Sequence, residues 1–201
     1  NRTSTPAYKI AGATFEHDME IGFPVLTTKK MAFKSARVEL EGFINGITDK
    51  KWYQDRNCKI WNEWCNPQKV SYAQDEETKQ LMEKERDLGA IYGFQWRHFG
   101  AEYKNYDTDY SGQGVDQLKN LIDVLKEDPN SRRMIVSAWN PKDLDKMALR
   151  PCHYSFQIDV IEDELNLSWN QRSVDTMLGL PFNIASYATL LNLLAKESGY
   201  K

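Results

Sequence analysis

The stretch that decides the fold is residues 171–188, which read QRSVDTMLGLPFNIASYA. It joins the end of a β-rich run to the start of an apolar helical run, and GLPFN at 179–183 marks the change. The tripeptide PCH at 151–153 lies upstream, so that its cysteine precedes the arginine of QRS by twenty residues. A cysteine, an arginine and an asparagine at these separations can supply a nucleophile, a fixed cation and a hydrogen-bonding amide.

The second half of the chain predicts an antiparallel sheet. Its β-rich runs are MIVSAW at 134–139, HYSFQIDVI at 153–161 and ELNLSWNQRS at 164–173. Glu162 and Asp163, between the last two runs, predict a hairpin turn. With the turn centred there, residue 172 would pair with residue 153. Arg172 would then lie within one residue of Cys152 on the neighbouring strand.

Three segments predict helices. Residues 30–46 place apolar side chains at helical spacing. Residues 115–125 predict a second amphipathic helix, which Asp128 and the proline after it close. The last helix is expected from about 183 to 197, with Gly199 as its stop.

Two remaining segments predict a loop and a charged, exposed stretch. Residues 101–114 are rich in Tyr, Asp, Asn and Gly, which is typical of a loop. Residues 74–87 are highly charged and predict an exposed helical or mobile stretch within a charged insertion at 65–88. We therefore expect one α+β domain over residues 1–201, a mostly antiparallel sheet packed with helices.

Bulk properties exclude several classes of function. A formal net charge of −3 gives no electrostatic reason to expect general nucleic-acid binding. No stretch approaches the ~20 apolar residues of a membrane span, and the first residues lack the apolar core of a signal peptide. The cysteines, Cys58, Cys65 and Cys152, are odd in number and lack metal-type spacing, which favours reduced thiols in a cytoplasm and predicts no metal site.

Cys152 is the best candidate for a nucleophile, although a cysteine is by default a small buried hydrophobe. His153 is the tempting partner, but adjacent residues on a strand point to opposite faces. Arg172 is the alternative activator, because a permanent cation beside a thiol favours the thiolate.

Other polar residues indicate an anionic, base-containing ligand. Arg132 and Arg133 lie where a loop meets a strand, where guanidiniums can fork onto phosphate oxygens or simply face solvent. Ser173 could join the same phosphate as Arg172. Asn183 is either a helix N-cap or an amide that reads one edge of a pyrimidine.

Two further features have a structural and a functional interpretation. Glu39 falls near the apolar stripe of the 30–46 helix, where a glutamate at the edge of the stripe would reach solvent. Trp61, Trp64 and Trp96 are core residues by default, but they could also form an aromatic wall for a flat heterocycle.

Together these motifs resemble the thymidylate synthase family over nearly the whole chain. The matching motifs are Arg2-Thr3, FPVLTTKK at 23–30, IWNEW at 60–64, YGFQWR at 92–97, DPNSRR at 128–133, and the stretches at 151–153 and 171–188. The resemblance implies methylation of 2′-deoxyuridine 5′-monophosphate at C5. It also implies 5,10-methylenetetrahydrofolate as the donor of the carbon and the hydride, and an obligate homodimer with two shared sites.

The resemblance also implies roles for individual residues. Cys152, assisted by Arg172, would add to C6 of the uracil; Glu39 would handle protons at O4 through water; Tyr92 is associated with removal of the C5 proton. The implied nucleotide ligands are Arg2, Arg132, Arg133, Gln171, Arg172, Ser173, Asp175, Asn183 and His153, with Arg132 and Arg133 reaching into the partner subunit's site. The implied folate ligands are Ile60, Trp61, Trp64, Asp175, Leu178, Gly179 and Phe182.

The chain departs from the family pattern in three places. Glu41-Gly42 replaces a usual Leu-Trp, which removes an aromatic side chain and is expected to put a second carboxylate near Glu39. Residues 65–88 lengthen the segment between Trp64 and Tyr92. The chain also ends before the Asp-x-His-x-Tyr motif that binds the deoxyribose and before the tail that closes over folate, so we expect a C-terminally truncated form.

Two alternatives stay open. One is a deoxyuridylate or deoxycytidylate hydroxymethylase, in which water quenches the exocyclic methylene. The other is a non-catalytic nucleotide-binding dimer. Asn183 favours uracil, since a carboxylate at that place would suit cytosine. Trp61 and Trp64 favour thymidylate by excluding water, whereas Glu41 could order a water and favour the hydroxymethyl product.

Overall fold

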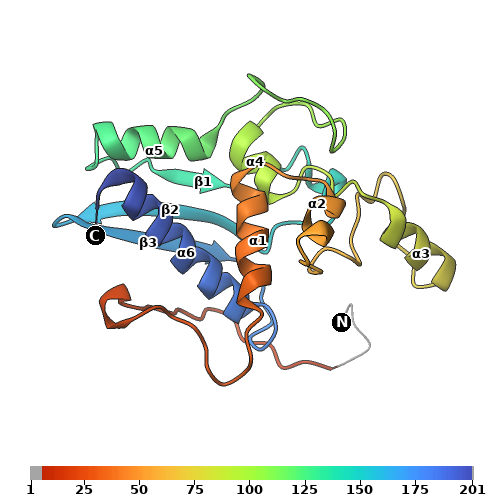
Figure 1. Cartoon of the computed structure of the whole chain (residues 1–201), viewed down its shortest axis with the longest axis horizontal. Coiled ribbons are helices and arrows are strands. Elements are labelled where there is room, and N and C mark those ends of the chain that lie inside the picture. Colours follow the sequence, from red (N-terminus) through yellow and green to blue (C-terminus); the bar gives the residue numbers. More distant parts are fainter. Residues whose placement is uncertain (1–5, 201) are drawn as a thin grey trace.

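The computed structural model describes residues 6–200 (Figure 1). Within these residues the elements follow in the order η1 (Met19–Ile21), α1 (Phe33–Ile44), α2 (Lys50–Asp55), α3 (Glu76–Lys84), α4 (Tyr92–His98), α5 (Gln117–Glu127), β1 (Ile135–Ser137), η2 (Leu144–Lys146), β2 (His153–Ile161), β3 (Glu164–Gln171) and α6 (Leu180–Ser198). Helices and an antiparallel sheet share one chain, so the α+β prediction is confirmed.

The sheet has the order β1-β2-β3, and both strand pairs are antiparallel. The hairpin between β2 and β3 turns at Glu162 and Asp163, whose φ angles of 51° and 68° are those of a tight two-residue turn. From Ile161 opposite Glu164 the register runs without interruption to Ser155 opposite Asn170. The predicted hairpin is therefore confirmed.

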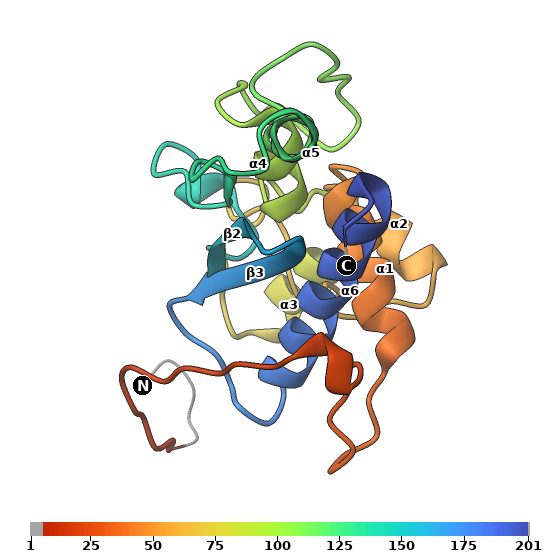
Figure 2. The ribbon, with the colours of Figure 1, turned by 90° about the vertical axis from the view of Figure 1, so that its left-hand side faces the viewer.

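Helices cover one side of this sheet (Figure 2). α5 packs on β1, α6 packs on β3, and α1 lies between α6 and α4. The strands alternate accordingly: Phe156 and Ile158 of β2 are fully buried, whereas Asn166 and Ser168 of β3 are exposed. One sheet face is thus in the core, and the other carries polar side chains.

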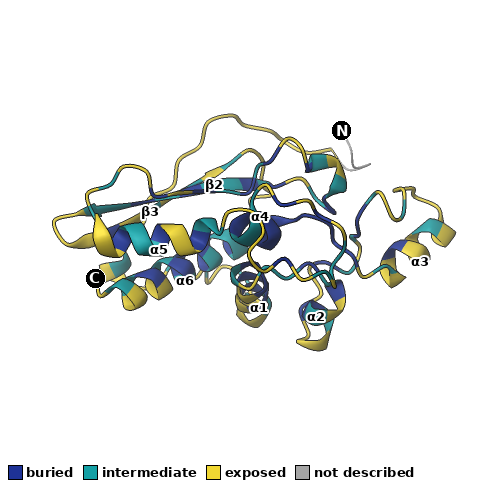
Figure 3. Cartoon of the chain, turned by 90° about the horizontal axis from the view of Figure 1, so that it is seen from above, coloured by how far each residue is buried: buried dark blue, intermediate teal, exposed yellow. Residues whose placement is uncertain are grey.

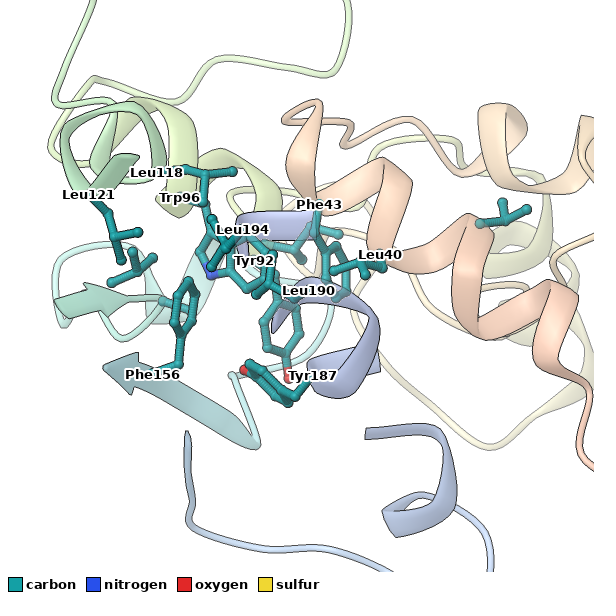
Figure 4. Packing of buried hydrophobic residues seen from close by; sticks show 14 of the residues in the cluster. Leu40, Phe43, Tyr92, Trp96, Leu118, Leu121, Phe156, Tyr187, Leu190 and Leu194 are labelled. Carbon is teal, nitrogen blue, oxygen red and sulfur yellow. The ribbon is translucent and has the colours of Figure 1, made fainter. Parts of the chain in front are cut away.

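Aromatic rings fill the space between the sheet and the helices (Figure 4). Phe43 of α1 stacks on Tyr92 of α4 at 4.8 Å between ring centroids and meets Trp96 edge-on at 5.8 Å. Trp96 in turn meets Phe156 of β2 at 5.3 Å, and Phe156 meets Tyr187 of α6 at 5.9 Å. A continuous aromatic core therefore joins α1, α4, β2 and α6.

The predicted segments agree with the structure except at their ends. α6 begins at Leu180 rather than at 183, because Pro181 fits the first turn of a helix, where its missing N–H costs nothing. Gly199 ends it in the left-handed conformation, as expected. The short helices α2 and α4 were not predicted, since six or seven residues carry too little periodicity.

The charged segment at 65–88 is tied to the body of the protein by Lys50. Its helix α3 projects from the body and buries only Met82 (Figure 3). The ammonium of Lys50, buried in α2, donates to the backbone carbonyls of Met82, Asn62 and Trp64 at 2.6, 3.2 and 2.9 Å.

On the described part of the chain, no helix combines the length and the apolar character needed to cross a bilayer.

Gly42 on α1 leaves room for a side chain from α2. A Cβ at this position of α1 would lie 2.3 Å from the hydroxyl oxygen of Tyr53. Tyr53 is fully buried, and its hydroxyl donates to the Ile47 carbonyl at 3.0 Å. The space that a side chain on α1 would take is therefore filled by an aromatic ring from α2.

Candidate active site

The site begins with the Cys152 thiol, just before β2. The Arg172 guanidinium Nη2 lies 3.8 Å from the Cys152 Sγ, and the Arg172 backbone N–H donates to the Cys152 carbonyl at 2.9 Å. The Cys152 backbone N–H donates to the hydroxyl oxygen of Tyr92 at 2.8 Å. A permanent cation therefore lies beside the thiol, and a phenol holds the backbone of the same residue.

The pairing that brings Arg172 to Cys152 differs from the prediction by one residue. A β-bulge between His153 and Ser155 leaves Tyr154 without a partner, so that His153 faces Gln171. Arg172 therefore lies directly opposite Cys152 instead of opposite His153. The turn centre was right, but a bulge cannot be read from the strand pattern.

Two carbonyls hold the Arg172 guanidinium in place. Its Nε donates to the Pro151 carbonyl at 2.8 Å, and Nη2 donates to the Arg150 carbonyl at 2.8 Å. Its Cζ lies 5.8 Å from the centre of the Trp139 ring. Within the described residues Nη1 has no hydrogen-bond partner, so it remains available to an anionic group.

His153 faces the core, away from the thiol. Its ring stacks on Tyr92 at 4.4 Å, and its Nδ1 lies 2.8 Å from the Tyr187 hydroxyl. Burial lowers the pKa of His153 to about 3, so the imidazole is neutral. The structure thus gives no sign of the Cys-His pair that the sequence argued against.

Glu39 is buried on α1 instead of reaching solvent from the edge of the apolar stripe. Burial raises the pKa of Glu39 to about 7, and the nearby Trp61 indole lowers it only in part. That indole N–H lies outside hydrogen-bonding geometry and has no partner among the described residues. A carboxyl that is half-protonated near neutral pH can both give and accept a proton.

The expected second carboxylate near Glu39 is absent. Glu41 is exposed, because residues two apart on a helix point about 200° away from each other. The prediction that Glu41 could order a water for the chemistry therefore loses its geometric support.

A small cavity joins three of the predicted site residues. Glu39, His153 and Asn183 border a space of about 10 Å³, together with the neighbouring ring of Tyr187. That volume is close to the smallest that admits a water molecule. Residues from α1, β2 and α6 thus converge on one polar point in the core.

Asn183 lies inside the first turn of α6, so it is not the N-cap that its sequence context allows. Its Oδ1 accepts from the Gln171 side-chain amide at 2.8 Å. Gln171 Oε1 in turn accepts from the Trp169 indole N–H at 3.1 Å. Trp169 and Tyr187 were missed by the sequence analysis, since a tryptophan in a strand and a tyrosine in an apolar helix look like core.

The implied folate residues differ in exposure. Trp61 is in the core with 3% of its surface exposed, whereas Trp64 and Phe182 are half-buried. Ile60 and Leu178 are exposed. Asp175 organises the loop before α6, because its Oδ1 accepts from the backbone N–H groups of Met177 and Leu178 at 2.9 and 2.7 Å, and Gly179 caps the helix. For Trp61, then, the core interpretation describes the structure better than an open wall.

The implied phosphate residues lie in different places. Ser173 is exposed beside Arg172. Arg132 and Arg133 are exposed before β1, and Arg132 borders a hollow with Asp159 at the opposite end of β2 from Cys152. Arg2 lies outside the described residues.

Comparison with known proteins agrees with this geometry. The family model described as thymidylate synthase matches residues 1–201. The chain is 44% identical to human thymidylate synthase over 203 residues, and 46% identical to the Bos taurus thymidylate synthase over 201 residues, covering 100% of this chain in both cases. It is also 46% identical to the bifunctional dihydrofolate reductase-thymidylate synthase of Paramecium tetraurelia, over 98% of this chain.

The chain belongs to the thymidylate synthase family. It spans 63% of the human protein, 55% of the bovine protein and 42% of the Paramecium protein. Among residues 6–200, no group of His, Cys, Asp or Glu side chains is arranged to hold a metal ion.

Proposed function

We propose that the protein methylates 2′-deoxyuridine 5′-monophosphate at C5 to give thymidylate, with 5,10-methylenetetrahydrofolate as co-substrate. The observation that carries this proposal is the position of the Cys152 Sγ, 3.8 Å from the Arg172 guanidinium and on a backbone held by Tyr92. A thiol beside a fixed cation is suited to conjugate addition, because the cation stabilises negative charge on the attacking sulfur. Membership in the family and the 44–46% identity to named thymidylate synthases support the same reaction.

Residues of this chain take part in each step of the proposed reaction. The Cys152 thiolate forms a bond to C6 of uracil, and the electrons of the C5–C6 double bond move towards C5 and O4. Glu39 stabilises the charge at O4 through a proton relay, which a carboxyl with a pKa near 7 can supply. C5 would then take up the one-carbon unit, for which the folate would supply both the carbon and the hydride and leave as dihydrofolate. Loss of the C5 proton, and release of Cys152 as the C5–C6 double bond forms again, complete the turnover.

Tyr92 helps to position the reacting groups. Burial raises the pKa of Tyr92 well above its usual value, so the phenol stays neutral and is a weak base. Its oxygen already accepts from the Cys152 N–H, which leaves its proton free to orient a water or the substrate. We therefore assign removal of the C5 proton to an acceptor that Tyr92 orients.

The nucleotide is held through its phosphate and its base. Arg172 Nη1 and the Ser173 hydroxyl lie on the same exposed segment, suited to phosphate oxygens. Asn183 borders the same small cavity as Glu39 and His153, and we assign its amide to the edge of the base. Ile60, Leu178 and Phe182 offer exposed or half-buried apolar surface to the folate, and Asp175 organises the loop that carries Leu178.

We also propose a homodimer in which Arg132 and Arg133 serve the partner subunit's site. Asp159, which borders the same hollow as Arg132, lies seven positions after Cys152, or roughly 20 Å away at strand spacing. An arginine side chain does not span that distance. The sheet face away from the helices is polar and lies next to these arginines, which suits it to a second copy: Ser155, Gln157, Asp159, Asn166, Ser168 and Asn170.

The three cysteines are all free, and two are buried, which supports a reducing compartment such as the cytoplasm.

No observation favours the hydroxymethylase, since Glu41 points away from the site. Product analysis tests the assignment: incubation with deoxyuridylate and methylenetetrahydrofolate should give thymidylate and dihydrofolate in equal amounts by mass spectrometry and absorbance. A 5-hydroxymethyl product without dihydrofolate would assign the hydroxymethylase, and nucleotide binding without any product would assign the non-catalytic dimer.

A further inference from the structure

The Trp169 indole begins a chain of hydrogen bonds that leads to Asn183. The indole nitrogen of Trp169 lies 3.1 Å from Gln171 Oε1, and Gln171 Nε2 lies 2.8 Å from Asn183 Oδ1. Trp169 is itself held by stacking on Tyr187, with 5.1 Å between ring centroids and 12° between ring planes. These contacts connect β3 to the first turn of α6.

The first donor in this chain removes the ambiguity of the amides that follow. Oxygen and nitrogen of an Asn or Gln side chain can exchange places by a flip, but an indole N–H can only donate. Trp169 therefore requires the oxygen of Gln171 on its side, which turns the Gln171 NH₂ group towards Asn183. That group in turn requires the oxygen of Asn183, so both amide orientations follow from Trp169.

We propose that Trp169 is a positioning residue for base specificity: through Gln171 it fixes the Asn183 amide so that the site accepts uracil and rejects cytosine. This inference rests on the proposed function, in which Asn183 reads the base. Within the described residues the Asn183 amide nitrogen has no partner, so it can donate to O4 of uracil. The second lone pair of Asn183 Oδ1 can accept from N3–H.

Cytosine meets this arrangement with the opposite pattern, an acceptor at N3 and an amino donor at C4. Accommodating it would need the Asn183 amide to flip, and the flipped NH₂ would face the NH₂ of Gln171. Flipping Gln171 as well would turn its NH₂ towards the indole N–H of Trp169. Whichever of these hydrogen bonds is broken, cytosine binding therefore leaves a half-buried donor unpaired, which costs binding free energy.

Calorimetric binding of deoxyuridylate and deoxycytidylate, without folate, tests the proposal. Trp169→Phe keeps a ring against Tyr187 but removes the donor, so both amides can flip together. We expect the ratio of deoxyuridylate to deoxycytidylate affinity to fall about tenfold, the effect of one misplaced hydrogen bond. Trp52→Phe, on α2 and far from the hydrogen-bond chain, is the matched control and should leave the ratio unchanged.

Gln171→Glu provides a second, nearly isosteric variant. Its carboxylate still accepts from Trp169 but can only accept from Asn183, so it should flip the Asn183 amide and shift the preference towards deoxycytidylate. If Trp169 and Gln171 had only a structural role, their replacement would weaken the binding of both nucleotides equally and leave the ratio of affinities unchanged. An unchanged ratio in both variants overturns the proposal, whereas a wild-type protein that binds neither nucleotide overturns the proposed function itself.

Discussion

Arg172 and Cys152 face each other across the β2–β3 pair, with the guanidinium Nη2 3.8 Å from the Sγ. The contact exists because a bulge moves the register by one residue, and because two carbonyls fix the guanidinium beside the thiol. The site thus places a permanent cation beside the nucleophile.

Replacing Arg172 should slow the reaction of the Cys152 thiol with an alkylating agent. Arg172→Gln is expected to lower the rate of Cys152 alkylation by iodoacetamide at pH 7 about tenfold, because the variant removes the cation that lies 3.8 Å from the reacting sulfur. Cys58 and Cys65 are fully buried, so Cys152 is the reactive cysteine in native protein. Arg56→Gln, which removes a charge on α2, is the control. Equal alkylation rates in the two variants would contradict the role of Arg172.

Glu39 should make the stability of the fold depend on pH. The pKa of Glu39 is about 7 in the folded protein, above its usual 4.5. The protonated carboxyl therefore stabilises the fold fully at pH 4, and this stabilisation is lost as the pH rises to 7 and above. Glu39→Gln should remove this loss and raise the free energy of unfolding at pH 8 by roughly 3 kcal/mol relative to wild type. Urea unfolding at pH 4 and pH 8 measures it. A constant difference between variant and wild type at both pH values would show that Glu39 titrates normally.

Gly42 should tolerate no side chain while Tyr53 is present. Gly42→Ala places a methyl group 2.3 Å from the buried Tyr53 hydroxyl and should destabilise the protein by about 1–3 kcal/mol. Tyr53→Leu alone leaves a cavity, and the double variant should cost less than the sum of the two single variants. Thermal unfolding of the four proteins measures the coupling, and strict additivity would refute the contact.

The second half of the chain was the more predictable half. β2 matches the predicted 153–161 run at both ends, and the Glu162-Asp163 turn follows directly from the gap between two alternating patterns. The bulge before Ser155, by contrast, is a local adjustment that the alternation does not encode. The predicted pairing of β2 with β3 was therefore correct to within one residue.

The predicted site was only partly encoded in the sequence. Cys152 and Arg172 meet because the hairpin brings their strands together, which the spacing already indicated. The burial of Glu39 and the exposure of Glu41 depend on how α1 packs against its neighbours, so a pattern that put Glu39 at the edge of an apolar stripe could not decide them. The link from Trp169 to Asn183 joins a strand to a helix and needed three-dimensional contacts to be seen.

The proposed dimer predicts that two defective subunits can rescue each other. A Cys152→Ala subunit and an Arg132→Ala/Arg133→Ala subunit should each be inactive alone. Mixed dimers should regain some activity, because one of their two sites combines an intact thiol with intact arginines. Turnover after mixing and exchange measures the rescue. If hybrid dimers form without any turnover, the arginines serve their own subunit's site or none.

The most direct test of the account is a covalent complex with 5-fluoro-2′-deoxyuridine 5′-monophosphate and 5,10-methylenetetrahydrofolate. Fluorine at C5 cannot leave as a cation, so the reaction should stop with the Cys152 sulfur bound to C6 and the one-carbon unit bound to C5. We predict a complex that survives denaturation, with the added mass on the peptide that contains Cys152, and no complex with Cys152→Ser. A wild-type protein that binds the nucleotide but forms no covalent complex, or an adduct on another residue, would contradict the central claim.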